Sequence, residues 1–298
     1  MIFKTLYIIF FATILVSLAF DPKTTQAFDW PDGAALAQRI QAIKLDIYYS
    51  KMLMAAKTRA NKQITAASYL AVDLSTGAVL LEKNQNKAYS IASVTKLMNA
   101  VVTLENIDTR ETITLTKAML APEGKSPAIF LGLNISGKKL LQASLIQSTN
   151  DAAESLARSL GKDKFLGLMN QKAKDLKMAS TAYYDVHGLN PKNRSTAADM
   201  AKLLSYIHTA HPEILDITKD NNFWLPNQNG ELLKFQNMNN FYSLPEFIGG
   251  KTGYTPEARQ TFAAIFDIDK KSVAIVVLRA ADFQADTFKI IDKIKATN

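Results

Sequence analysis

The sequence lacks several residues on which protein chemistry often depends. None of its 298 residues is cysteine, only three are histidine and only two are tryptophan. Disulfides, thiolate nucleophiles, zinc ribbons and iron–sulfur clusters are therefore excluded, and three histidines remain for metal chemistry. Repeats and low-complexity tracts are also missing from the sequence. The 48% hydrophobic and 21% charged residues that are present form the composition of a globular protein with a large core.

Acidic side chains are the scarcer of the two charge types. The chain has 27 acidic and 35 basic residues, which gives a formal net charge of +8. Such a balance suits an anionic neighbourhood, for example nucleic acid, a membrane surface or a cell-wall polymer. Charge alone does not choose between these partners.

The first residues narrow that choice. An apolar run from Thr5 to Phe20 follows Lys4 and precedes the small residues of Thr25-Gln26-Ala27, a pattern typical of an export signal. An uncleaved membrane anchor is the alternative, although this run is shorter than the roughly 20 residues that span a bilayer. We therefore expect an exported protein of the periplasm or cell envelope. Its basic side chains then meet an anionic envelope polymer or substrate carboxylates, and not nucleic acid.

The apolar spacing along the chain separates strands from helices. Strand-like runs at 69–72 and 78–81 flank a turn that contains Gly77, and a second pair of runs lies at 261–268 and 272–278. Helical spacing covers the stretches 93–105, 138–147, 150–160, 163–176, 196–207 and 283–296. Strands thus come from both ends of the chain and helices mostly from its centre. This arrangement predicts an α+β fold with a central antiparallel sheet, in which early and late strands pair, with flanking helices and an all-helical insertion.

Ser93 and Lys96 lie three residues apart at the start of a predicted helix. Residues i and i+3 share one helix face, so the hydroxyl and the amine can meet. A serine hydroxyl is a poor nucleophile until a neighbour accepts its proton, and a lysine can accept it when burial or a nearby cation lowers the lysine pKa. The pair is therefore a candidate nucleophile and base. A helix N-cap is the alternative for Ser93.

The same Ser-x-x-Lys pattern occurs a second time, at Ser136 and Lys139. Gly137 disfavours a helix at that point, and the pair Lys138-Lys139 is expected to be solvated. We interpret this second occurrence as a coincidence without chemical function.

Two further motifs follow in the chain. Ser148-Thr149-Asn150 precedes a predicted helix, where serine and asparagine are common N-cap residues. Lys251-Thr252-Gly253 follows two glycines and is predicted to lie at a strand edge. At such an edge a glycine lets a substrate backbone approach closely, while the lysine and the hydroxyl can hold a carboxylate. A plain turn is the alternative.

The order Ser-x-x-Lys, Ser-x-Asn, Lys-Thr-Gly matches the set found in penicillin-binding proteins and class A β-lactamases. The chain resembles in particular the penicillin-binding D-alanyl-D-alanine carboxypeptidases, serine peptidases that trim peptidoglycan stem peptides. The segments that carry this resemblance are Ile91–Met98, Ser148–Ala153, His187–Leu189 and Gly249–Thr255.

The resemblance implies the β-lactamase/DD-peptidase-like fold and an acyl-enzyme mechanism without metal or organic cofactor. The catalytic residues that it implies are the nucleophile Ser93, the base Lys96 and the proton relay Ser148. The substrate-binding residues are Asn150, Lys251, Thr252, Gly253 and Tyr254. The backbone N–H groups of Ser93 and Tyr254 form the implied oxyanion hole. The expected partners are the peptidoglycan stem peptide and, as covalent inhibitors, β-lactam antibiotics.

The resemblance also divides the chain and leaves variants open. We expect a signal peptide at 1–27, a helical lead-in at 28–62 and the catalytic domain at 63–298. The family often has an arginine in an Asn-x-Asn segment before Lys-Thr-Gly, whereas this chain has Met238 there. With one carboxylate contact fewer, endopeptidase action on cross-links is an alternative to carboxypeptidase action.

Three other interpretations differ more strongly. A class A β-lactamase needs a glutamate that activates the deacylating water, but Val186 occupies that position ahead of Leu189-Asn190. A noncatalytic wall-binding protein does not require a nucleophile and a base. A metal site at His208 and His211 lacks an acidic ligand at a recognised spacing, so a helix-end surface position is the preferred interpretation.

Overall fold

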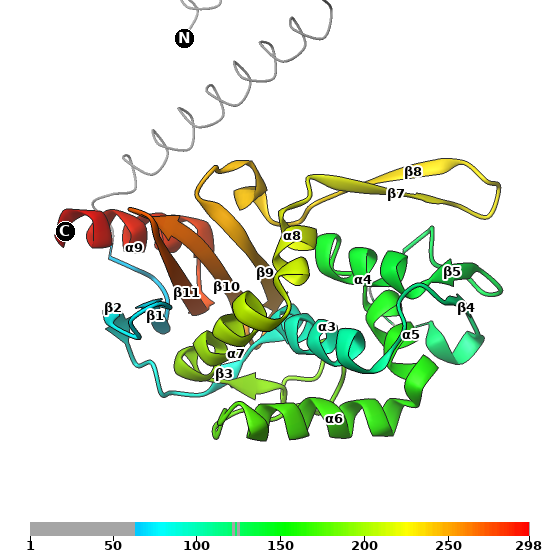
Figure 1. The fold of residues 1–298 in the computed structure, drawn as a ribbon, viewed down its shortest axis with the longest axis horizontal. Coiled ribbons are helices and arrows are strands. Elements are labelled where there is room, and N and C mark those ends of the chain that lie inside the picture. The colour runs from blue at the N-terminus through cyan, green and yellow to red at the C-terminus, as the bar shows by residue number, and fades with distance from the viewer. Residues whose placement is uncertain (1–62, 121–122, 124–125, 298) are drawn as a thin grey trace, which may run out of the picture. The chain divides into compact units, whose positions relative to one another are not determined.

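The computed structural model describes residues 63–120, 123 and 126–297 (Figure 1). The expected signal peptide and helical lead-in lie outside the described residues. Within the described part of the chain, no helix has both the length and the apolar character needed to cross a bilayer.

A five-stranded antiparallel sheet with the order β2-β1-β11-β10-β9 forms the centre of the fold. The strands are β1 (Ser68–Asp73), β2 (Val79–Lys83), β9 (Phe247–Thr255), β10 (Arg259–Ile268) and β11 (Lys271–Ala280). Both predicted hairpins are confirmed. The predicted pairing of early and late strands is also confirmed, because β1 runs antiparallel to β11 from Ser68↔Leu278 to Asp73↔Val273.

Helices cover both faces of this sheet, which explains why its central strands are almost continuously apolar. Residues 261–266 of β10 and 273–278 of β11 are all buried. Helix α9 (Phe283–Thr297) covers one face over a cluster of phenylalanines centred on Phe241, whose ring lies 5.1 Å from that of Phe262. Helix α7 (Ala197–Ala210) packs on the opposite face (Figure 1).

The helical insertion lies beside the edge strand β9. It contains the 3-10 helix η1 (Ala92–Val94) and the helices α3 (Thr95–Asn106), α4 (Gly137–Ile146), α5 (Asn150–Leu160), α6 (Lys162–Asp175) and α8 (Pro212–Lys219). Two short two-stranded antiparallel sheets accompany these helices. One pairs β3 (Tyr89–Ser90) with β6 (Arg194–Ser195), and the other pairs β4 (Thr112–Thr114) with β5 (Asn134–Ser136). The predicted helical stretches are confirmed, and none of their ends is shifted by more than three residues. Because η1 contacts both β9 and β10, the first motif lies against the strand that carries the third.

The sequence analysis did not anticipate helix α8 or the hairpin of β7 (Asn222–Pro226) and β8 (Leu232–Gln236). The hairpin extends as a long arm over α4 (Figure 1). On its buried side the rings of Phe223 and Phe235 stack with their centroids 5.1 Å apart. A 3-10 helix, η3 (Asn240–Ser243), then leads the chain back to the sheet.

Candidate active site

The backbone just before Ser93 is held in an unusual conformation. Ala92 has a φ of +47°, in the left-handed region that residues other than glycine rarely adopt. Hydrogen bonds on both sides of the preceding Ile91 hold it there, because its N–H donates to the Asn193 carbonyl at 3.1 Å and its carbonyl accepts from Thr261 Oγ1 at 3.0 Å. Residues that their surroundings hold in such a rarely populated backbone conformation are common at functional sites. It places Ser93 at a sharp turn between β3 and α3.

The Lys96 amine is buried and has three polar neighbours. Its side chain is fully buried, and Nζ lies 3.0 Å from Ser93 Oγ, 2.7 Å from Asn150 Oδ1 and 2.9 Å from the carbonyl oxygen of His187. The amide and carbonyl oxygens can only accept hydrogen bonds. A neutral amine has two N–H groups and one lone pair, so these two acceptors take both N–H groups. The lone pair is then left for the Ser93 hydroxyl, which donates to it.

The surroundings of Lys96 favour that neutral form. Burial is the main cause that holds the pKa of Lys96 well below its usual range, and the neighbouring Lys251 lowers it further, while Asp185 acts in the opposite direction. A lysine becomes a base near neutral pH under these conditions. The first motif therefore has both the geometry and the electrostatics of a nucleophile beside its base.

Asn150 connects the second motif to Lys96. It is the first residue of α5, and its side chain does not cap the helix: Oδ1 faces Lys96 while Nδ2 donates to the Glu123 carbonyl at 3.2 Å. Asn99 fixes the two helices, because its Nδ2 donates to the carbonyls of Ala153 in α5 and Val186. The family resemblance also implies that Asn150 orients Lys96, and these contacts agree with that role.

Ser148 is the sequence-predicted residue with the weakest connection to this group. Its φ is +63°, a second strained position next to the site, but its hydroxyl forms no hydrogen bond with another residue in the described part of the chain. Its role as proton relay stays a prediction.

The third motif forms part of the edge strand β9, as predicted. Gly253 lets this strand pass close to η1, because a Cβ there would lie 2.8 Å from the Ser93 nitrogen. Lys251 is buried and donates to the Thr252 carbonyl at 3.0 Å, and burial lowers the pKa of its amine to about 7. Tyr254 follows with its ring largely exposed. The strand edge thus presents a backbone and a weakly basic amine beside the nucleophile.

A loop that the sequence analysis left without a role completes the site. Asp185 binds the loop together: its carboxylate accepts from the backbone N–H groups of His187, Gly188 and Asn190. Gly188, at a φ of +96°, packs so closely that a Cβ would lie 1.9 Å from the Ala92 carbonyl oxygen. The sequence indicates a role for His187-Gly188-Leu189 only through the family resemblance. Its glycine was the one available signal that a backbone approaches closely here.

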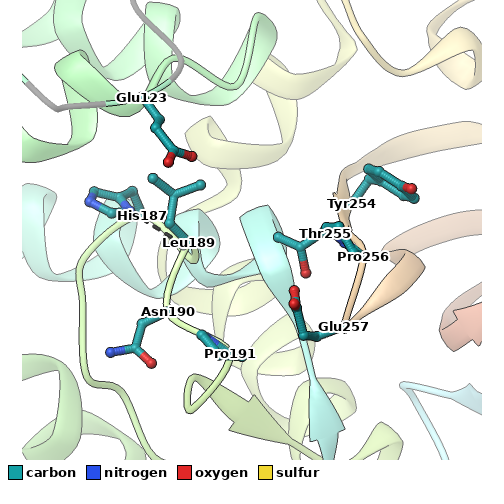
Figure 2. Close-up of a pocket in the computed structure, with 9 residues that line it drawn as sticks. All are labelled: Glu123, His187, Leu189, Asn190, Pro191, Tyr254, Thr255, Pro256 and Glu257. Carbon is teal, nitrogen blue, oxygen red and sulfur yellow. Dashed lines mark hydrogen bonds between the residues drawn. The ribbon is translucent and has the colours of Figure 1, made fainter.

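An open cavity of about 670 Å³ lies between this loop and the end of β9. Figure 2 shows Glu123, His187 and Leu189 on one side of it and Tyr254 and Glu257 on the other. Two of its lining residues belong to the site: Tyr254 follows the third motif, and the carbonyl of His187 contacts Lys96.

The remaining candidates lie elsewhere or have structural roles. The second Ser-x-x-Lys pattern is a helix start, as interpreted, because Ser136 caps α4 by accepting from the Lys139 N–H at 3.4 Å. His211 faces Glu105 and Glu213 at the surface end of α7. Met238 is 60% exposed, and its N–H donates to the carbonyl of Ile146 at the end of α4.

A serine with a neutral lysine as its base, beside a strand edge that can bind a peptide, defines a serine hydrolase. A family model for D-alanyl-D-alanine carboxypeptidases matches residues 55–282, so the chain belongs to this family and is a serine-type DD-peptidase. The resemblance described from the sequence is confirmed.

Individual relatives agree with the family match. The chain is 34% identical to the D-alanyl-D-alanine carboxypeptidase DacB2 of Mycobacterium tuberculosis over 200 residues, which cover 66% of this chain and 69% of the relative. It is 32% identical to a D-alanyl-D-alanine endopeptidase of Escherichia coli over 242 residues, with 76% and 75% covered. Its fold is similar to that of a penicillin-binding protein of Listeria monocytogenes solved with cefotaxime bound. That match has a TM-score of 0.69 and 30% identity, and covers 79% of this chain and 99% of the other.

The contacts of residues 185 and 186 bear on the rival interpretation as a class A β-lactamase. Val186 is fully buried, and Asp185 is occupied by backbone N–H groups of its own loop, so neither activates a water as the glutamate of a class A β-lactamase does. The noncatalytic alternative does not account for a buried lysine held with its lone pair toward a serine.

Proposed function

We propose that this chain is a penicillin-sensitive D-alanyl-D-alanine carboxypeptidase that hydrolyses peptidoglycan stem peptides through an acyl-enzyme on Ser93. The observation that carries the proposal is the position of the Lys96 amine between two obligate acceptors and the Ser93 hydroxyl. Burying a lysine amine costs free energy, because its charged form is no longer solvated by water. Lysines whose pKa is shifted by burial are concentrated at catalytic sites.

The reaction has two balanced steps. Ser93 Oγ attacks the carbonyl between the two terminal D-alanines while Lys96 accepts the hydroxyl proton. The carbon–nitrogen bond then breaks, and D-alanine leaves with a proton delivered from Lys96 through Ser148. In the second step water attacks the ester, its proton returns through the same groups, and the shortened peptide and free Ser93 are released.

The substrate lies along β9 in this proposal. The negative charge that develops on the carbonyl oxygen is held by the backbone N–H groups of Ser93 and Tyr254, and each donor contributes about 3 kcal/mol to stabilising the transition state. Lys251 and Thr252 bind the terminal carboxylate, and Asn150 bonds the substrate amide. Gly253 supports this arrangement indirectly, because the absence of a side chain lets β9 lie close to the backbone nitrogen of Ser93.

Endopeptidase action on cross-links is the second candidate. It is supported by the exposed Met238, which stands where the family often has an arginine, and by the similarity to the endopeptidase of Escherichia coli. In this variant the amine that leaves when the acyl-enzyme forms belongs to a neighbouring stem peptide instead of to free D-alanine.

The covalent chemistry predicts inhibition by β-lactams, because a strained amide that acylates Ser93 leaves the amine tethered to the adduct. The similarity to a penicillin-binding protein solved with cefotaxime supports this expectation. We also propose export to the periplasm or cell envelope, where peptidoglycan lies, on the basis of the apolar run near the N-terminus. Fractionation of cells that express the full chain tests it, and recovery in the cytoplasm with the first residues intact would contradict it.

Purified muropeptides test the activity directly. Monomeric pentapeptides are expected to lose one D-alanine, which mass spectrometry detects, while Ser93→Ala protein leaves them intact. Conversion of cross-linked dimers to monomers would instead assign the endopeptidase. Failure to change either substrate, in a preparation that does bind penicillin covalently, would refute both activities.

A further inference from the structure

The side chain of His187 has no part in the chemistry above, although its backbone carbonyl holds Lys96. The residue is only 7% exposed, and it lines the cavity between its own loop and the end of β9 (Figure 2). A buried imidazole needs partners for both ring nitrogens, because an unpaired buried polar group is costly. The neighbours of the two nitrogens therefore indicate what the ring does.

Nε2 of His187 faces an oxygen that lacks a donor. Glu154, in α5, is 3% exposed, and its Oε1 accepts from Arg158 Nε and Lys162 Nζ, both at 2.7 Å. Its Oε2 is buried without a hydrogen-bond partner among the described residues and lies 3.8 Å from His187 Nε2. A ring that carries its proton on Nε2 directs a donor at this oxygen.

Nδ1 of His187 faces both a possible acceptor and a donor. The acceptor is Asp185 Oδ2 at 3.4 Å, and the donor is the backbone N–H of Leu189, also at 3.4 Å. The Asp185 carboxylate already accepts from the backbone N–H groups of three loop residues and from Asn193 Nδ2. Because Asp185 has its donors and Glu154 Oε2 has none, the neutral ring with its proton on Nε2 satisfies more groups than the other tautomer.

We propose that His187 is a positioning residue whose ring, with its proton on Nε2, directs this N–H at Glu154 Oε2 and so holds the 185–190 loop against helix α5. Asn150 begins that same helix, one turn before Glu154. This contact therefore fixes the distance between the two acceptors of Lys96, which are Asn150 Oδ1 on the helix and the His187 carbonyl on the loop. It thereby keeps the lone pair of Lys96 directed at Ser93. The inference rests on the proposed role of Lys96 as the base.

The charges around the ring agree with a neutral imidazole. Burial is the main cause that lowers the pKa of His187, and the charge of Lys162 lowers it further. Asp185 and Glu154 act in the opposite direction. The ring is thus expected to stay uncharged at neutral pH, and its tautomer, not its charge, determines the contact with Glu154.

Nitrogen-15 NMR of the unmodified protein tests the tautomer. The chain has three histidines, so labelled imidazoles give few signals, and a His187→Gln sample assigns the relevant one. We expect a neutral ring protonated on Nε2 at pH 7. A ring protonated on Nδ1, or a charged ring at this pH, would overturn the proposal.

Paired substitutions test the effect on catalysis. In His187→Gln the amide N–H₂ reaches the position of Nε2, whereas in His187→Asn it is too short to reach Glu154. We expect the maximal rate of acylation by a fluorescent penicillin to fall about tenfold or more in His187→Asn, because the base is misplaced, and to return to within about threefold of wild type in His187→Gln. The surface variant His208→Gln is the matched control with an unchanged rate.

The outcomes separate this inference from the proposed function. If the wild type is not acylated by penicillin at all, the proposed function fails. If the wild type is acylated and both His187 variants react at its rate, only the positioning role is refuted. Equal losses in the two variants, with unchanged thermal unfolding, would also refute it, because the donor at the Nε2 position would then have no effect.

Discussion

Ser93 and Lys96 lie at the start of α3, and Ser136 and Lys139 lie at the start of α4 with the same spacing. At the first pair the amine is fully buried and lies 3.0 Å from the serine hydroxyl. At the second pair Lys139 is exposed, and the Ser136 hydroxyl accepts from the backbone N–H of Lys139 at 3.4 Å, as an ordinary helix cap. The same four-residue pattern therefore brings a hydroxyl and a buried amine together in one place and forms a helix terminus in the other.

The difference lies in residues that are distant in the sequence. The Lys96 amine is held by Asn150 and by the His187 carbonyl, and its pKa is lowered by burial and by Lys251. Nothing comparable surrounds Lys139 in the described part of the chain. The comparison teaches that the spacing of a serine and a lysine allows them to meet, whereas burial and fixed acceptors turn the lysine into a base.

The largest expected effect comes from breaking the first pair. Ser93→Ala and Lys96→Met are each expected to lower D-alanine release by on the order of 10³-fold or more, because the nucleophile or its base is lost. Lys139→Met is the matched control and should retain wild-type activity. Residual turnover of more than a tenth in Lys96→Met would show that another group serves as the base.

A smaller effect is expected from disturbing the backbone next to Ser93. Gly188→Ala places a methyl group where the Ala92 carbonyl oxygen lies, at a φ that alanine rarely adopts. The displaced turn should lower acylation by penicillin on the order of 100-fold. Gly167→Ala, in α6, meets nothing within 4 Å and should leave acylation unchanged while stabilising the helix by up to about 1 kcal/mol. Equal rates in the two variants would show that the turn tolerates the displacement.

The pH dependence of kcat/KM tests the effect of burial on a second lysine of the site, Lys251. The pKa of Lys251 is about 7, and the charged amine binds the substrate carboxylate, so kcat/KM should fall as pH rises above about 7, approaching tenfold per pH unit. Lys251→Arg keeps its charge and should lose this alkaline limb. A substrate with an amidated C-terminus should lack the limb too. If kcat/KM for the substrate with a free C-terminal carboxylate stays constant from pH 7 to 9, Lys251 does not bind that carboxylate through its charge.

The smallest effect is expected at the second pair. Ser136→Ala removes a helix cap and should lower the free energy of unfolding by about 1 kcal/mol, measured by chemical denaturation. The same variant should release D-alanine at the wild-type rate. A loss of activity without a loss of stability would mean that the two pairs had been assigned the wrong way round.

Much of the fold follows from local patterns in the sequence. The strand-like runs at 69–72, 261–268 and 272–278 predict strands whose pairing the structure confirms, and the helical spacing predicts α3 to α7. The β7–β8 hairpin escaped prediction because Pro226 ends its first strand and its exposed side includes Trp224 and Leu232, so polar and apolar residues do not alternate clearly.

The site was predictable where its residues form motifs. The contact of Asn150 with Lys96 agrees with the role that the resemblance implies. The close contact of Gly253 with the Ser93 turn was not expected, because this glycine was interpreted as making room for a substrate backbone. The loop that carries His187 was not assigned a role, because side-chain-to-backbone bonds from Asp185 hold it and these leave no periodic signal. Its link to Lys96 joins residues 91 positions apart, which spacing within a motif cannot reveal.

The most direct test of the account is to locate the covalent adduct that penicillin forms with the protein. Intact-mass measurement followed by peptide mapping should find one penicillin per chain on the peptide that contains Ser93, and no adduct in Ser93→Ala. A wild-type protein without any adduct, or an adduct on Ser136 or Ser148 that persists in Ser93→Ala, would contradict the assignment of Ser93 as the nucleophile.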